Sequence, residues 1–125
     1  MRYDLTQIVL VNESRAEERA GDVSLFIGMK MAASSLEAVD VRNNEYRAYC
    51  LDGSRLKLTE DGLHVSIELT NGERNEQLIR SLLEQAAAFV IAAHSKRGNR
   101  HKFHSVDLPK LSIDELVDIV GVKKW

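Results

Sequence analysis

Alternating apolar and polar side chains in the middle of the chain constrain the fold more than any other feature. Residues 45–72 hold three runs of this kind, separated by the pairs Asp52-Gly53 and Asp61-Gly62. An Asp-Gly pair favours a tight hairpin turn, because glycine adopts a positive φ without the steric penalty of a side chain. The segment therefore predicts an antiparallel β-meander with one buried face and one exposed face.

The N-terminal third of the chain predicts further strands. Residues 3–11 are rich in β-branched and aliphatic side chains, which favours a strand. Residues 22–31 alternate with a period of two, which predicts a strand with Met29 and Met31 on its buried side. Residues 38–41 are a candidate for a short strand or an edge strand. Together with the meander, these segments predict a sheet of about five or six strands.

Two short helices are predicted from the spacing of their capping residues. A helix over residues 112–120 follows Ser112, and Glu115 stands three residues later, as in a capping box. Ser14 and Glu17 have the same spacing and predict a helix of one or two turns.

A longer helix is predicted over residues 75–96, where the apolar positions recur every three or four residues. We expect this helix to cover the buried face of the meander. The fold class is therefore α+β: an antiparallel meander sheet, one long helix packed on one face, and a short C-terminal helix. The apolar positions of the long helix are Leu78, Ile79, Leu82, Leu83, Ala86, Phe89, Val90 and Ala93.

Length and composition indicate one globular domain over residues 1–125, because 44% hydrophobic and 29% charged residues are ordinary values for such a chain. Cys50 is the single cysteine, so no disulfide forms within the chain. Together with the lack of a signal-peptide pattern, this predicts a cytoplasmic protein. No run approaches the roughly 20 apolar residues that cross a bilayer, so no membrane partner is expected.

Residues 94–104 form a basic segment in a chain whose net charge is −2. Clustered Lys and Arg side chains bind phosphates, and an aromatic ring stacks on unpaired bases. The segment is therefore a candidate RNA- or DNA-binding or phosphate-binding site. A solvated loop is the competing interpretation, because the acidic remainder of the chain opposes nucleic acid. The candidate residues are Lys96, Arg97, Arg100, His101, Lys102, Phe103 and His104.

Three histidines in this segment, His94, His101 and His104, raise the question of a metal site or an active site. Neighbouring cations repel a divalent ion, and structural zinc sites usually include cysteine, so we expect neither a metal nor another cofactor. A small phosphate-handling enzyme that uses His64, His101 or His104 is a further hypothesis. The chain lacks a recognised catalytic motif, which favours a non-enzymatic role and leaves no catalytic residue to nominate.

The exposed face of the meander is a second candidate binding site, since Arg and Tyr are enriched at protein interfaces. The leading hypothesis is accordingly a small cytosolic, non-catalytic protein-binding module, such as an inhibitor, a toxin-neutralising immunity protein or an adaptor. An acidic body suits a basic partner, for example a nuclease or toxin. Pairing of exposed sheet edges with a second copy, which would give a homodimer, is left open. The face residues are Arg47, Tyr49, Arg55, Lys57, His64 and Glu68.

Overall fold

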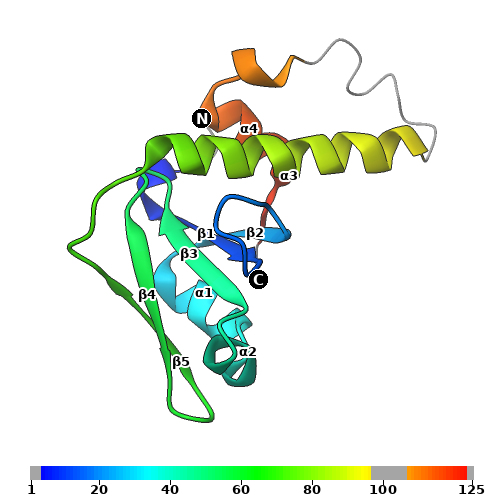
Figure 1. The fold of residues 1–125 in the computed structure, drawn as a ribbon. Coiled ribbons are helices and arrows are strands. Elements are labelled where there is room, and N and C mark those ends of the chain that lie inside the picture. The colour runs from blue at the N-terminus through cyan, green and yellow to red at the C-terminus, as the bar shows by residue number, and fades with distance from the viewer. Residues whose placement is uncertain (1–3, 97–106, 124–125) are drawn as a thin grey trace.

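A six-stranded sheet with helices on both faces forms the centre of the computed structural model, which describes residues 4–96 and 107–123, without the side chains of residues 95 and 96 (Figure 1). The strand order is β5-β4-β3-β1-β2-β6. Neighbouring strands are antiparallel except for the parallel pair β2 and β6. The α+β class is confirmed, and the sheet is mixed. The strands are β1 (Ile8–Glu13), β2 (Asp22–Ile27), β3 (Tyr46–Cys50), β4 (Arg55–Glu60), β5 (Val65–Leu69) and β6 (Val122–Lys123).

The helices form two layers, one on each face of the sheet. Apolar side chains of α3 and α4 join those of β1 and β2 in one core cluster. Side chains of α1 join those of β1, β2, β3 and β4 in a second cluster on the other face. The helices are α1 (Met29–Ser35), α2 (Ala38–Arg42), α3 (Glu76–Lys96) and α4 (Ile113–Val120), with short 3₁₀ helices at Leu5–Gln7 and Leu108–Lys110.

Strand β1 lies between these two cores, which explains its unbroken apolar run. Ile8 and Leu10 belong to the α3 side, whereas Val9 and Val11 belong to the α1 side. A strand that is buried on both faces has no exposed position for a polar residue. The predicted strand over residues 3–11 is therefore present, shifted to Ile8–Glu13.

The long helix covers a different face from the predicted one. By register, Leu10 pairs with Tyr49 and Tyr49 with Arg55, so one face of the sheet is apolar at β1 and charged at β4. Helix α3 packs on the apolar end of that face. The apolar side chains of the meander, such as Leu56 and Ile67, lie on the opposite face, where α1 and α2 cover them. The prediction of one exposed and one buried face was wrong for β3, because helices cover both of its faces. It holds for β4 and β5, where one face exposes Arg55, Lys57, Ser66 and Glu68.

Two predicted strand segments are helical. The strand predicted over residues 22–31 ends at Ile27, because Gly28 adopts φ 85° and turns the chain away from the sheet. Met29 and Met31 pack on the core from α1 instead. The segment at residues 38–41, predicted as a strand, belongs to α2. The period of two wrongly predicted a strand at Met29 and Met31, because both side chains also pack on the core from a short helix.

The predicted C-terminal helix is confirmed, and the predicted helix after Ser14 is wrong. Ser112 Oγ accepts from the Glu115 backbone N–H at 3.1 Å, and a Glu115 carboxylate oxygen accepts from the Ser112 N–H at 3.1 Å. Ser14 Oγ instead accepts from the Ala16 N–H at 3.1 Å, and the chain forms turns rather than a helix there. Helix α3 spans the predicted range, although Phe89 of its predicted apolar stripe is 77% exposed.

Candidate functional site

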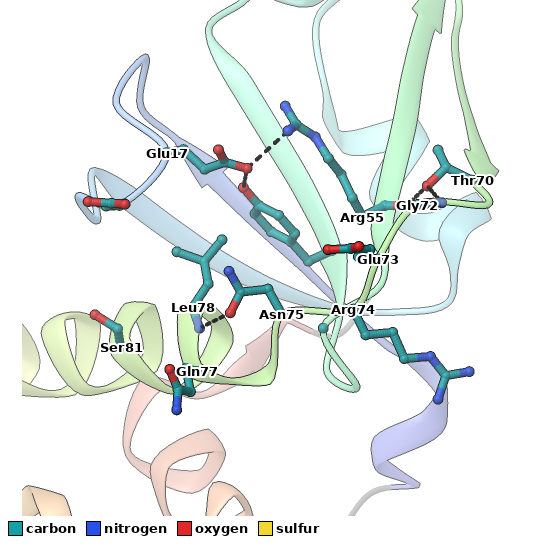
Figure 2. Close-up of a pocket in the computed structure, with 13 residues that line it drawn as sticks. Glu17, Arg55, Thr70, Gly72, Glu73, Arg74, Asn75, Gln77, Leu78 and Ser81 are labelled. Carbon is teal, nitrogen blue, oxygen red and sulfur yellow. Dashed lines mark hydrogen bonds and ion pairs between the residues drawn. The ribbon is translucent and has the colours of Figure 1, made fainter.

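An open groove of about 770 Å³, here called the Tyr49 groove, lies between the first turns of α3, the sheet and two loops (Figure 2). One loop, residues 14–21, connects β1 to β2, and the other, residues 70–75, connects β5 to α3. The groove is lined by Glu17, Glu18, Tyr49, Gly53, Arg55, Thr70, Gly72, Glu73, Arg74, Asn75, Gln77, Leu78 and Ser81.

The loop of residues 14–21 is held against the sheet by buried and half-buried side chains. Asn12 is fully buried in β1, donates to the Arg19 carbonyl at 3.0 Å and accepts from the Gly21 N–H at 2.8 Å. Gln85 of α3 accepts from the Ala20 N–H at 2.9 Å and donates to the Glu18 carbonyl at 3.0 Å. These contacts fix the backbone that presents Glu18 to the groove.

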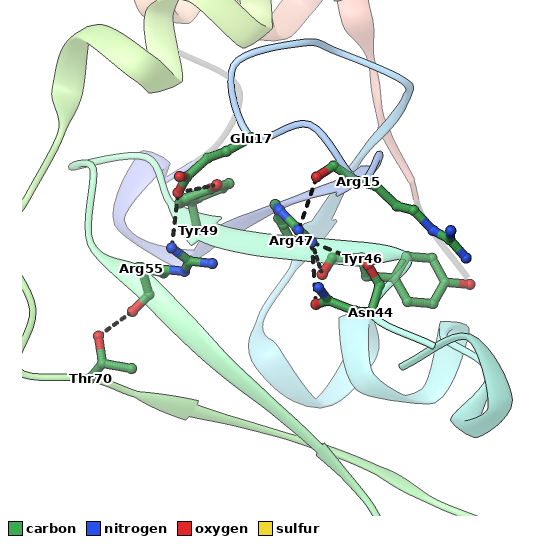
Figure 3. Close-up of polar contacts among 8 residues, drawn as sticks. All are labelled: Arg15, Glu17, Asn44, Tyr46, Arg47, Tyr49, Arg55 and Thr70. Atoms are coloured by element: carbon green, nitrogen blue, oxygen red, sulfur yellow. Dashed lines mark hydrogen bonds and ion pairs between the residues drawn. The ribbon is translucent and has the colours of Figure 1, made fainter. Parts of the chain in front are cut away.

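Tyr49, Glu17 and Arg55 form a hydrogen-bonded chain across the floor of the groove (Figure 3). The Tyr49 hydroxyl donates to Glu17 Oε1 at 3.1 Å, and Arg55 donates to the same oxygen at 3.0 Å. The Tyr49 ring is buried, with 2% of its surface exposed. Burial, followed by the negative charge of Glu17, raises the pKa of Tyr49 to about 12.

The opposite wall of the groove depends on a close contact between Gly53 and the start of α3. The Gly53 carbonyl accepts from the Asn75 N–H at 3.0 Å. The Asn75 side chain in turn accepts from the Leu78 N–H at 3.0 Å and caps the first turn of the helix. The β3–β4 turn and α3 therefore meet backbone to backbone.

The charges of the groove are only partly compensated. Arg55 pairs with Glu17 at 3.0 Å, and Arg74 pairs with Asp52 at 3.6 Å. Glu18 and Glu73 also line the groove, and neither has an ion-pair partner among the side chains that the structure describes. The groove thus offers two unpaired carboxylates to a ligand.

The structure divides the predicted face residues among several places. Tyr49 and Arg55 reach the Tyr49 groove, although the Tyr49 ring is buried and not exposed as predicted. Arg47 donates to the Arg15 carbonyl at 3.0 Å and so holds the 14–21 loop (Figure 3). The other three lie on the β4–β5 hairpin. Lys57 is opposite Glu68 in register, and His64 contacts Asp61 at 3.6 Å near the hairpin tip.

Sequence reasoning missed Glu17, Glu18, Glu73 and Arg74 as site residues. The acidic composition of residues 12–22 was a visible signal, but it carries no information on which part of the sheet the loop reaches. The structure describes only the first residues of the basic segment, residues 94–104. His94 lies in the last turns of α3, the side chain of Lys96 is not described, and the other predicted phosphate-binding residues lie outside the described residues.

No group of three or more His, Cys, Asp or Glu side chains that could hold a metal ion occurs in the part of the chain that the structure describes. Within that part, no helix is both long enough and apolar enough to cross a membrane. Cys50 is half-buried, and burial raises the pKa of its thiol. Comparisons with protein-family models, curated proteins and solved structures found no match to this chain.

The tyrosines predict a loss of stability at alkaline pH. Tyr49 and Tyr46 each have a pKa of about 12 in the folded chain, against the ordinary tyrosine value of 10.0. The folded state therefore holds these protons more tightly, and the free energy of unfolding falls as the pH rises from about 10 to about 12. Tyr49→Phe removes one of the two groups, so urea titrations across this range should give a shallower fall. A variant with the wild-type slope would contradict the assignment.

Proposed function

We propose that this chain is a small, non-catalytic protein-binding module of the inhibitor, immunity-protein or adaptor type, and that the Tyr49 groove receives a basic side chain of its partner. The observation that carries the proposal is the pair of carboxylates, Glu18 and Glu73, that line the groove without an ion-pair partner within the described residues. Basic side chains of a partner would compensate them.

The residue types around these carboxylates support a protein partner. Arg is among the residues most enriched at interface hot spots, and the exposed Arg55 lines the groove together with the two acids. Arg55 and Arg74 each pair with a carboxylate, which weakens their attraction for a phosphate. The net charge of −2 also favours a basic partner through electrostatic steering. A chain with a single cysteine suits the reducing cytoplasm.

The test is partner capture with a charge-reversed groove. Wild type, a Glu18→Lys/Glu73→Lys double variant and a Glu37→Lys/Asp118→Lys control with the same change of net charge are immobilised and exposed to nuclease-treated lysate of the native cell. Glu37 and Asp118 are exposed and lie outside the groove. We expect one stoichiometric basic protein on wild type and control only, and at least about a 100-fold loss of affinity in the groove variant once that protein is purified.

Two results would overturn this proposal. Equal capture by the groove variant and wild type would show that the groove is not the binding surface. Retention of nucleic acid alone, in a parallel arm without nuclease, would favour the alternative in which residues 94–104 bind RNA or DNA. In that case the affinity falls steeply with salt, and falls again when Lys96, Arg97, Arg100 and Lys102 become Ala.

A further inference from the structure

Strand β5 forms an edge of the sheet, and Glu68 is the only charged residue in it. The strand pairs only with β4 among the described strands. Proteins usually protect an edge with a lysine, a proline or a bulge. Residues 65–69 contain none of these, and their register with β4 is continuous. The hairpin of β4 and β5 also extends away from α3 (Figure 1).

Apolar surface accompanies this edge on the α1 side of the sheet. Leu69 is 65% exposed, although it shares a face with Ile67, which packs on the core. A second groove, of about 580 Å³ and here called the α1 groove, lies between β5 and α1. Val65 and Ile67 line it from the strand, and Met29 lines it from the helix. An exposed apolar side chain and an open groove of mixed polarity thus lie on the same edge strand.

We propose that β5 pairs with β5 of a second copy of this chain, antiparallel, about a two-fold axis at Ile67. Antiparallel pairing about this residue places Val65 opposite Leu69 of the second copy. Because Val65 lines the α1 groove, the exposed Leu69 of each copy lies beside the α1 groove of the other. One symmetric contact then covers both features, as an isologous interface requires.

The polar face of the edge is compatible with this register. The same register places Ser66 opposite Glu68 of the second copy, so no like charges face each other across the new pair. Within each chain Glu68 already lies opposite Lys57. The pairing uses the β5 edge and the α1 side of the sheet, whereas the Tyr49 groove opens between the α3 start and the loops of residues 14–21 and 70–75. The inference therefore does not depend on the proposed function.

Ser66 offers a matched pair of test variants, because it is exposed and lies directly opposite Glu68 in the proposed dimer. A five-residue strand contact is small, so we expect a weak dimer, with Kd on the order of 10 μM by sedimentation equilibrium. Ser66→Glu places two pairs of like charges across the axis and should raise Kd roughly five-fold, whereas Ser66→Lys should lower it by a similar factor. A chain that stays monomeric at about 1 mM, or equal Kd values for the two variants, would overturn the proposal.

Disulfide trapping tests the register. In a Cys50→Ala background, a mixture of Ser66→Cys and Glu68→Cys chains should form a heterodimer under mild oxidation, because directly opposite residues lie within bonding distance. Either chain alone should form few dimers, since its two cysteines are diagonal and about 7–8 Å apart. Equal dimer yields in the mixture and in the single-variant samples would contradict the axis at Ile67. The Glu18→Lys/Glu73→Lys variant should dimerise like wild type.

Discussion

Replacing Gly53 with alanine should destabilise the protein by about 3–5 kcal/mol, because two independent penalties act at this one position. Gly53 has φ 95°, a conformation that residues with a side chain rarely adopt. A Cβ there would also lie 2.6 Å from the backbone N and C atoms of Asn75 and 2.7 Å from the Glu76 N. Those atoms belong to the start of α3, so relief of the overlap requires the helix itself to shift.

Gly62→Ala is the matched control, and it separates the two penalties. Gly62 has φ 99°, close to the value at Gly53, but nothing lies within 4 Å of a Cβ built there. It should therefore show the conformational cost alone, about 1–2 kcal/mol. Urea denaturation of both variants gives the comparison. Equal losses in the free energy of unfolding would mean that α3 shifts at little cost. That result would contradict a tight backbone contact between the β3–β4 turn and the helix.

The parts of the fold that the sequence predicted correctly depend on local chemistry. The meander is marked by a period of two and by the Asp-Gly turns, and Gly53 and Gly62 have the positive φ that such turns need. The helix α4 is marked by a capping box that Ser112 and Glu115 complete through contacts with their own neighbours. None of these features requires a contact with a distant part of the chain.

The errors arose where the outcome depends on distant partners. Leu10, Tyr49 and Arg55 lie in one row across β1, β3 and β4. Leu10 and Tyr49 are buried in the core beside α3, whereas Arg55 lies beyond the part of the sheet that α3 covers. The sequence of one strand does not show how much of the sheet a distant helix covers. The Ser14 capping box failed for a similar reason, since the Glu17 side chain that it needs binds Tyr49 and Arg55 instead.

The candidate site was half predictable. Tyr49 and Arg55 stood out as interface residue types on one strand face. Their common partner Glu17 lies 32 and 38 positions away in the sequence. It reaches them because the 14–21 loop folds back over the sheet. Composition shows that this loop is acidic, but only the contacts of Asn12, Arg47 and Gln85 determine where the acids lie.

Asn12→Leu tests this positioning and should cost about 2–4 kcal/mol of folding stability. Leucine has a similar size, but it leaves the Arg19 carbonyl and the Gly21 N–H without the partners that Asn12 supplies at 3.0 and 2.8 Å. Each half-buried backbone group without a partner costs about 1–3 kcal/mol. Asn43→Leu is the control, because Asn43 is exposed, and its stability should stay within about 0.5 kcal/mol of wild type.

The same variant has a second readout that distinguishes a positioning role from a purely structural one. If Asn12 fixes the loop, its loss also moves Glu17 away from Tyr49, and the negative charge that helps to raise the Tyr49 pKa is removed. The tyrosine absorbance titration of folded Asn12→Leu should therefore shift to lower pH, as it should in Glu17→Gln. A loss of stability with an unchanged titration would mean that other contacts, such as those of Gln85, hold Glu17 in place without Asn12. The acids of the groove would then be fixed from the helix and not from the sheet.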